Sequence, residues 1–198
     1  MTTDGPWLVV GLGNPGAQYA STRHNVGYLT LDVLASRGGA TLTSHRSRTH
    51  TADVRLGIGP GGVPGPRVIL ARSDSFMNTS GGPVSKLMRT HKAAPDHLIV
   101  IHDELDIDPG TIRVKFGGGH AGHNGLRSIC DKLGTRDWYR VRIGIGRPPG
   151  RKPVVDWVLS RPRSKDDTEA FDHAVAEGSN AVLCLIDNGL EKTQQRFN

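Results

Sequence analysis

Short apolar runs alternate along this chain with stretches in which apolar residues recur at helical spacing. Trp7–Val10 and Leu98–Ile101 are apolar throughout, which is typical of strands buried on both faces of a sheet. The predicted strands are Trp7–Val10, Arg67–Ala71, Leu98–Ile101, Thr111–Phe116 and Trp138–Ile145, with a further extended segment over 41–58 and a turn at Gly57–Pro66.

Helical spacing predicts four helices. They are Asn25–Arg37, roughly Pro83–Lys92, roughly Asn124–Leu133, and a last helix after the capping box formed by Ser164 and Asp167. Strands that alternate with helices favour an α/β fold. We therefore expect a single globular domain over 1–198, with a mixed, partly parallel twisted sheet and helices packed on both faces.

The composition fits this picture and excludes several classes of protein. The 198 residues are 36% hydrophobic, enough for a proper core. The longest apolar runs, such as Ala181–Ile186, are too short to cross a membrane, and the first residues lack the apolar segment of a secretory signal. Two cysteines, Cys130 and Cys184, make a poor disulfide framework, so we expect a cytoplasmic protein.

The charge is unevenly distributed. Residues 1–165 hold 23 basic and 12 acidic side chains, whereas residues 166–198 hold two and seven. Arginine supplies 18 of the 25 basic residues, and its guanidinium is the side chain best shaped for bidentate contact with phosphate. Nucleic acid is therefore the first candidate for a partner. Ordinary solubility charge is the alternative.

Polar side chains follow three of the predicted strands. They are Asn14, Tyr19 and His24 after the first, Phe76, Met77 and Asn78 after Arg67–Ala71, and His102 and Asp103 after Leu98–Ile101. In open α/β sheets ligands bind beyond the carboxyl ends of the strands, so parallel neighbours would bring these side chains to one cleft. Asn124 could join them from a helix N-terminus, where backbone N–H groups favour an anion.

A histidine beside an aspartate is a general base, because the carboxylate fixes the tautomer and stabilises the imidazolium. Asparagine amides can donate to a developing oxyanion. No Gly-x-Ser-x-Gly elbow and no obvious nucleophilic cysteine occur, so the pattern predicts direct activation of water and hence hydrolysis.

Each of these residues also has a structural interpretation. His24 and Asp103 could be caps, Asn14 and Asn78 could be turn formers, and an aromatic residue such as Phe76 or Tyr19 could belong to the core. Their convergence on one sheet edge favours the functional interpretation.

Two predicted strands each have a basic side. Arg113 and Lys115 share one face of Thr111–Phe116, and Arg140 and Arg142 share one face of Trp138–Ile145. Close together, they would form a cationic patch that holds phosphates. A solvated face or a charge-protected sheet edge is the alternative. A proline-rich loop with Arg147, Arg151 and Lys152 could extend the patch.

Other motifs carry less weight. Gly11-x-Gly13-x-x-Gly16 matches the dinucleotide fingerprint, but no apolar strand ends in an acid about 20 residues later, and no P-loop motif occurs. His102-x-Glu104 lacks the Pro-Cys-x-x-Cys of a zinc deaminase, and His120 with His123 lacks an evident third ligand. We expect neither a cofactor nor a metal.

At this point the sequence resembles the bacterial-type peptidyl-tRNA hydrolases. The matching segments are VVGLGNPG (9–16), Tyr19 with TRHNVG (22–27), FMNTSG (76–81), IVIHDELD (99–106), GGGHAGHNGLRS (117–128) and YRVRIGIGRPPGR (139–151). The resemblance implies a monomeric α/β enzyme that cleaves the ester between a peptide and the 3′-terminal ribose of tRNA, and so recycles tRNA dropped by the ribosome.

The resemblance also implies roles for particular residues. His24 matches the catalytic base, Asp103 its carboxylate partner, and Asn14 the residue linked to telling blocked from free aminoacyl-tRNA. The residues that match substrate-binding positions are Tyr19, Phe76, Asn78 and Asn124. Lys115 and Arg142 match a pair that clamps the terminal phosphate of tRNA.

The sequence departs from the family at Ala121, where many members have glycine, and in the segment before Phe76. Residues 38–66 and the last 30 or so match weakly. The alternatives from other classes are a non-catalytic RNA-binding protein, which would not need His24 with Asp103, and a nucleotide-dependent oxidoreductase, which would need the missing acid.

Overall fold

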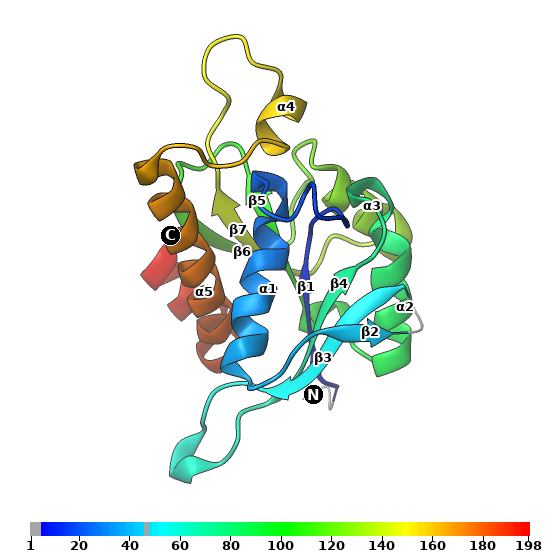
Figure 1. Ribbon diagram of the computed structural model, residues 1–198. Helices are drawn as coiled ribbons and strands as arrows, with labels where there is room; N and C mark the ends of the chain where they lie inside the picture. Colours follow the sequence, from blue (N-terminus) through cyan, green and yellow to red (C-terminus); the bar gives the residue numbers. More distant parts are fainter. Residues whose placement is uncertain (1–4, 46–47) are drawn as a thin grey trace.

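The computed structural model describes residues 5–45 and 48–198, which form one mixed sheet covered by helices (Figure 1). The strands are β1 (Trp7–Gly11), β2 (Thr43–His45), β3 (Thr49–Arg55), β4 (Arg67–Ser73), β5 (Leu98–Glu104), β6 (Ile112–Phe116) and β7 (Tyr139–Gly144). Their order is β2-β3-β4-β1-β5-β7-β6. The four central strands are parallel, and the outer ones pair antiparallel. The predicted fold class is confirmed.

Helices cover both faces of the sheet. Helices α1 (Val26–Arg37) and α5 (Lys165–Phe197) pack against each other on one face, and α2 (Gly81–His91) and α3 (Asn124–Leu133) pack together on the other (Figure 1). A short helix, α4 (Val154–Val158), lies beyond the carboxyl ends of the strands. The 3₁₀ helices are η1 (Arg23–Asn25), η2 (Pro60–Gly62), η3 (Met77–Thr79) and η4 (Pro95–His97).

The continuous apolar strands supply two cores. Along β1, Leu8 and Val10 belong to the core under α2 and α3, while Val9 belongs to the core under α1 and α5. In β5, Ile99 and Ile101 likewise face the α1 side. Because successive side chains of a strand point to opposite faces, a strand covered on both faces must be apolar at every position.

Helix α1 rests directly on the backbone of the central strands. A Cβ on Gly27 would lie 2.5 Å from the carbonyl oxygen of Ile101, and one on Gly11 would lie 2.2 Å from the carbonyl oxygen of Gly27. A Cβ on Gly13 would lie 2.7 Å from the ring of Tyr28. Two glycines of the dinucleotide-like pattern are thus needed for packing, without reference to a nucleotide.

The observed elements differ from the predicted ones at several boundaries. Strand β5 continues to Glu104, because it pairs with β7 as far as Gly144, so His102 and Asp103 lie inside a strand. Helix α4 was not predicted. In the predicted extended segment 41–58, positions 46–47 lie outside the described residues, and β3 ends at Arg55, after which Ile58 still forms an isolated bridge with Pro64.

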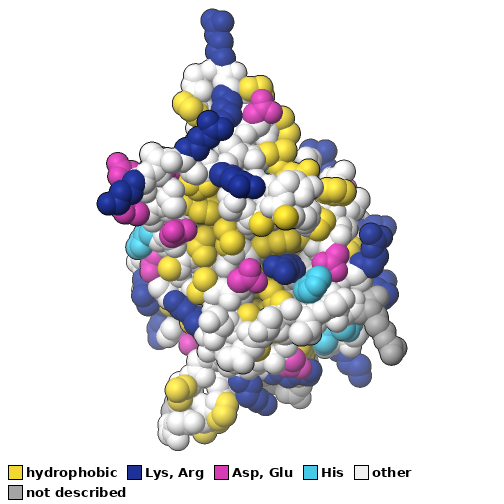
Figure 2. All heavy atoms as spheres, in the orientation of Figure 1, with side chains coloured by type: hydrophobic (Ala, Val, Ile, Leu, Met, Phe, Trp, Pro, Cys, Tyr) yellow, Lys and Arg dark blue, Asp and Glu magenta, His cyan; other side chains and the backbone are white. Residues whose placement is uncertain are grey.

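Two further findings concern the surface and the thiols. The connection between β3 and β4 projects from the molecule, and its exposed Ile58 and Val63 are apolar (Figures 1 and 2). Cys130 and Cys184 are both free thiols. Within the described part of the chain, no helix has the length and apolar character that a membrane crossing requires.

Candidate active site

A cleft of about 770 Å³ opens beyond the carboxyl ends of the central strands. Six of the seven residues predicted to bind substrate or to take part in the reaction line it, namely Asn14, His24, Phe76, Asn78, Asp103 and Asn124. The seventh, Tyr19, packs edge to face against the cleft residue Phe76, with 6.4 Å between the two ring centroids. The sheet topology therefore brings these side chains together as predicted.

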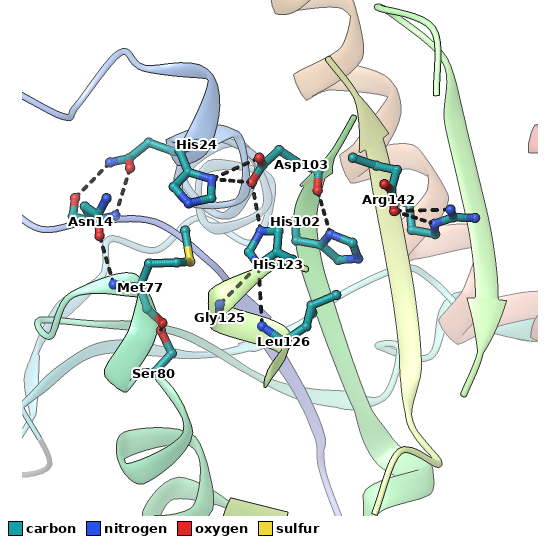
Figure 3. A network of polar contacts seen from close by, with 12 residues as sticks. Asn14, His24, Met77, Ser80, His102, Asp103, His123, Gly125, Leu126 and Arg142 are labelled. Carbon is teal, nitrogen blue, oxygen red and sulfur yellow. Dashed lines mark hydrogen bonds and ion pairs between the residues drawn. The ribbon is translucent and has the colours of Figure 1, made fainter. Parts of the chain in front are cut away.

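His24 and Asp103 form a close pair in this cleft (Figure 3). The Nδ1 atom of His24 lies 2.8 Å from Oδ1 and 2.9 Å from Oδ2 of Asp103, whose side chain is 2% exposed. A carboxylate only accepts, so Nδ1 carries the proton and Nε2 is the basic nitrogen. Among the contacts of the described residues, none engages Nε2.

Sequence reasoning missed the part that His123 plays. Its Nε2–H donates to Oδ1 of Asp103 at 3.0 Å, and its Nδ1 accepts from the backbone N–H groups of Gly125 at 3.2 Å and Leu126 at 3.4 Å (Figure 3). His123 is thus the N-cap of α3. Its position directly before the predicted helix at Asn124 was the available signal. The cap fixes the tautomer that donates to Asp103.

Electrostatics couple the three side chains. Burial by itself would raise the pKa of Asp103, but the facing His24 and His123 hold that pKa well below its ordinary value. Burial lowers the pKa of His24, and the charge and hydrogen bond of Asp103 outweigh that effect, so the pKa of His24 is raised. Asp103 is therefore an anion that makes His24 a stronger base.

His102 does not line the cleft. It is 1% exposed, and its Nδ1–H donates to the backbone oxygen of Asp103 at 2.7 Å. Burial and the neighbouring His123 hold its pKa well below the ordinary value, so it is neutral. The expectation that His102 faces the cleft was wrong, because successive residues of β5 point to opposite faces.

Asn14 is held in one orientation. The backbone N–H of Met77 donates to its Oδ1 at 2.8 Å, and its backbone pairs with the side chain of Asn25 at 2.8 and 2.9 Å. With Oδ1 occupied, the Nδ2–H₂ group is the one left for the cleft. Asn25, which fixes this loop, was not singled out from the sequence.

His24, Asp103 and His123 are also the described residues whose ligand-type atoms cluster closely enough for a metal, within 4.8 Å of one another. The proton positions on the His123 ring argue against a metal site. A metal on Nε2 of His123 would require a proton on Nδ1, where two backbone N–H groups already point. His120 is not a member of the cluster, and its Nδ1 accepts from the N–H of Gly122 at 3.2 Å.

The two basic strands pair as predicted, with Arg113 opposite Arg142 and Lys115 opposite Arg140. Their accessibilities differ, however. Arg140 is fully buried, and its guanidinium carbon lies 4.2 Å from the ring centroid of Trp138. Its guanidinium donates to the carbonyl oxygens of Gly118 and Gly119. It anchors the loop after β6, so the expectation of four phosphate-facing cations was wrong for Arg140.

The other cations of this region have varied partners. Arg113 donates to the backbone oxygen of Asn198 at 2.5 Å, and Arg142 pairs with Glu104 at 3.1 Å. Arg147 lines the cleft and pairs with Asp106. In the loop anchored by Arg140, Ala121 has a φ of 47°, a left-handed conformation that glycine adopts more readily. This gives the departure at Ala121 a physical meaning.

An α/β sheet with a His–Asp pair at its carboxyl edge, in which the carboxylate is buried, and with no Ser, Thr or Cys among the described residues that line the cleft, defines a general-base class of enzyme site. The chain belongs to the peptidyl-tRNA hydrolase family, whose sequence model matches residues 8–198.

Named relatives agree with this assignment. The chain is 52% identical to the peptidyl-tRNA hydrolase of Kineococcus radiotolerans, over 97% of this chain and 96% of the relative. It is 53% identical to that of Frankia alni, over 100% and 96%. The crystal structure of peptidyl-tRNA hydrolase from Acinetobacter baumannii superposes with a TM-score of 0.87 at 34% identity, covering 100% of this chain and 97% of that one.

Proposed function

We propose that this protein hydrolyses the ester between a peptide and the 3′-terminal ribose of tRNA, in the cytoplasm, and so recycles tRNA dropped by the ribosome. Membership of the family supports the reaction. The observation that carries it is the His24–Asp103 pair, with both carboxylate oxygens within 2.9 Å of Nδ1 and the basic Nε2 left for the cleft.

In the proposed mechanism, Nε2 of His24 takes a proton from a water molecule as the water oxygen attacks the ester carbonyl. The carbonyl oxygen becomes an oxyanion, and an asparagine amide with nearby backbone N–H groups donates to it. The C–O bond to the ribose then breaks, and the imidazolium returns its proton to the departing ribose oxygen. Asp103 stabilises the imidazolium throughout, and no covalent intermediate forms.

We assign substrate binding to the rest of the cleft. We assign the Nδ2–H₂ of Asn14 to recognition of a blocked substrate, in which the carbonyl oxygen of the acyl group on the amino nitrogen can accept from it. Tyr19 and Phe76 offer aromatic surface, and Asn78 and Asn124 offer exposed amides to the peptide. The α4 side of the cleft adds apolar contact through Val154, Val155, Val158 and Leu159.

The basic face of β6 and β7 is assigned to tRNA. Lys115 and Arg142 are the cations proposed to clamp the terminal phosphate, and contacts of this kind position a nucleic acid without reading its sequence. That suits an enzyme that accepts many tRNAs. We propose a monomer that needs neither metal nor cofactor.

The test is release of free tRNA from N-acetyl-aminoacyl-tRNA, compared with unblocked aminoacyl-tRNA. We expect cleavage of the blocked substrate alone, and its loss in His24→Ala. Absence of cleavage together with tight, salt-sensitive tRNA binding would favour a non-catalytic RNA-binding protein instead.

A further inference from the structure

Strand β5 ends in two adjacent carboxylates with different partners. Asp103 holds His24 and His123, whereas Glu104 accepts from Arg142. Both Nε of Arg142, at 3.2 Å, and Nη2, at 3.1 Å, donate to one oxygen, Oε2 of Glu104. Glu104 also lines the cleft, although its side chain is only 10% exposed. It therefore lies in the wall between the cleft and the basic face.

The basic face is crowded with positive charge. Burial lowers the pKa of Lys115, and the charges of Arg142 and Arg140 lower it further. The Glu104 carboxylate opposes these effects at Lys115 and again at Arg140. Since like charges close together repel, Arg142 would swing away from Lys115 unless something held it. The contact that holds it is the one with Glu104.

The pairing leaves part of Arg142 available. A guanidinium has five N–H donors in a fixed fork, and Glu104 engages only the edge formed by Nε and Nη2. The side chain of Arg142 remains 22% exposed. The opposite edge, formed by Nη1 and the second N–H of Nη2, has the geometry for two oxygens of a phosphate monoester.

We propose that Glu104 is a positioning residue that orients Arg142 toward the terminal phosphate of tRNA and thereby sets the preference for 5′-phosphorylated substrate. The inference rests on the proposed function and adds a residue to it. The alternative is competition, in which Glu104 neutralises Arg142 in the free enzyme and is displaced from it when the phosphate binds. Positioning predicts that loss of Glu104 weakens phosphate recognition, and competition predicts the reverse.

The experiment compares N-acetyl-aminoacyl-tRNA with a 5′-monophosphate and with a 5′-hydroxyl. The readout is the ratio of the two kcat/KM values, measured for wild type, Glu104→Gln, Glu104→Ala, Arg142→Ala and the double variant Glu104→Ala with Arg142→Ala. Binding of the two deacylated tRNAs to each protein is measured in parallel. Asp53→Asn is the matched control, because Asp53 pairs with Arg67 at 2.6 Å on an exposed part of the sheet.

We expect the preference to fall about tenfold in Glu104→Ala, the size of one charge-assisted hydrogen bond, and less in Glu104→Gln, which keeps an acceptor oxygen. In the Arg142→Ala background, removing Glu104 should have no further effect on the ratio, because the two residues act as a unit. Asp53→Asn should keep the wild-type ratio.

Three results would overturn the proposal: an unchanged ratio in Glu104→Ala, tighter binding of the 5′-phosphorylated tRNA in that variant, or additive effects in the double variant. Failure of the proposed function is distinguishable, because wild type would then cleave neither substrate. The parallel binding measurements would still report whether Glu104 acts on phosphate recognition. Thermal unfolding confirms that each variant is folded.

Discussion

His123 donates through Nε2 to Asp103 at 3.0 Å while its Nδ1 caps helix α3, so one imidazole joins a helix start to the buried carboxylate. The cap prevents the ring from changing tautomer, and the tautomer in turn gives Asp103 a second donor beside His24. The orientation of the candidate base His24 therefore depends, through Asp103, on the N-terminus of α3, which lies on the opposite face of the sheet from α1.

Substitution of His123 should separate its two contacts. His123→Asn keeps a capping oxygen and His123→Ala does not, so the alanine variant should be about 1 kcal/mol less stable than the asparagine variant. Both should lower kcat, because both remove the imidazole donor to Asp103. Thermal unfolding and single-turnover hydrolysis measure the two effects. Equal stability of the two variants would contradict the capping role.

His24→Ala should lower kcat by about 10² to 10⁴-fold, the usual contribution of a positioned general base. Affinity for tRNA should hardly change, because the ring lies in the cleft and away from the basic strands. The matched control is His173→Ala, at an exposed position on α5. A near-normal kcat in His24→Ala would rule out the proposed base.

Asp103→Asn should move the pH dependence of hydrolysis in a defined direction. The base acts in its neutral form, so kcat/KM rises as the pH passes the pKa of His24. Burial lowers that pKa and Asp103 raises it above the ordinary value. Without the carboxylate, the rise should shift to lower pH while the plateau rate falls. An unshifted profile in the variant would show that Asp103 does not act through His24.

Folding stability should respond to the same carboxylate. Because the folded pKa of Asp103 is lowered, its contribution is complete above the ordinary value of 3.8 and is lost as the pH falls through the folded pKa. His24 has the opposite sign: its pKa is raised, so its contribution is complete below 6.5 and is lost as the pH rises through the folded pKa. Chemical denaturation across pH, with wild type beside Asp103→Asn, should show that the variant lacks both dependences.

Lys115→Ala or Arg142→Ala should raise KM for full-length peptidyl-tRNA and reduce the slope of log K against log salt by about one. A short esterified oligonucleotide without a 5′-phosphate should be cleaved as by wild type. Arg67→Ala is the matched control, since Arg67 is an exposed cation on β4, away from the basic face, where it pairs with Asp53 at 2.6 Å. Equal effects on both substrates would contradict the clamp.

The sheet edge was predictable because parallel strands end at the same side of a sheet. Apolar runs located β1 and β5, and the polar residues after them identified Asn14, His24 and Asp103. Alternation likewise placed Lys115 on the basic side of its strand and Arg142 on the basic side of its own, and the pairing of β6 with β7 puts the two sides on one face of the sheet.

What escaped prediction depends on contacts between distant segments. Alternation places Arg140 beside Arg142, but only the return of the loop at Gly118 and Gly119 buries it. The position of His123 before a helix indicates a cap, yet not the carboxylate on its far side. Helix α4 spans five residues after a proline-rich loop, too few to show a helical period.

The close approach of Gly27 to the carbonyl of Ile101 has a consequence for how the protein tolerates change. Gly27 lies three positions after His24, and Ile101 lies two before Asp103. The spacing between the side chains of His24 and Asp103 is thus set by direct contact between the backbones of α1 and β5, with no side chain in between that could be repacked. A single methyl group at Gly27 would push α1 away from β5 and so move the base away from the carboxylate. No residue is smaller than glycine and there is no room for a larger one, so neither evolution nor design has an alternative at this position.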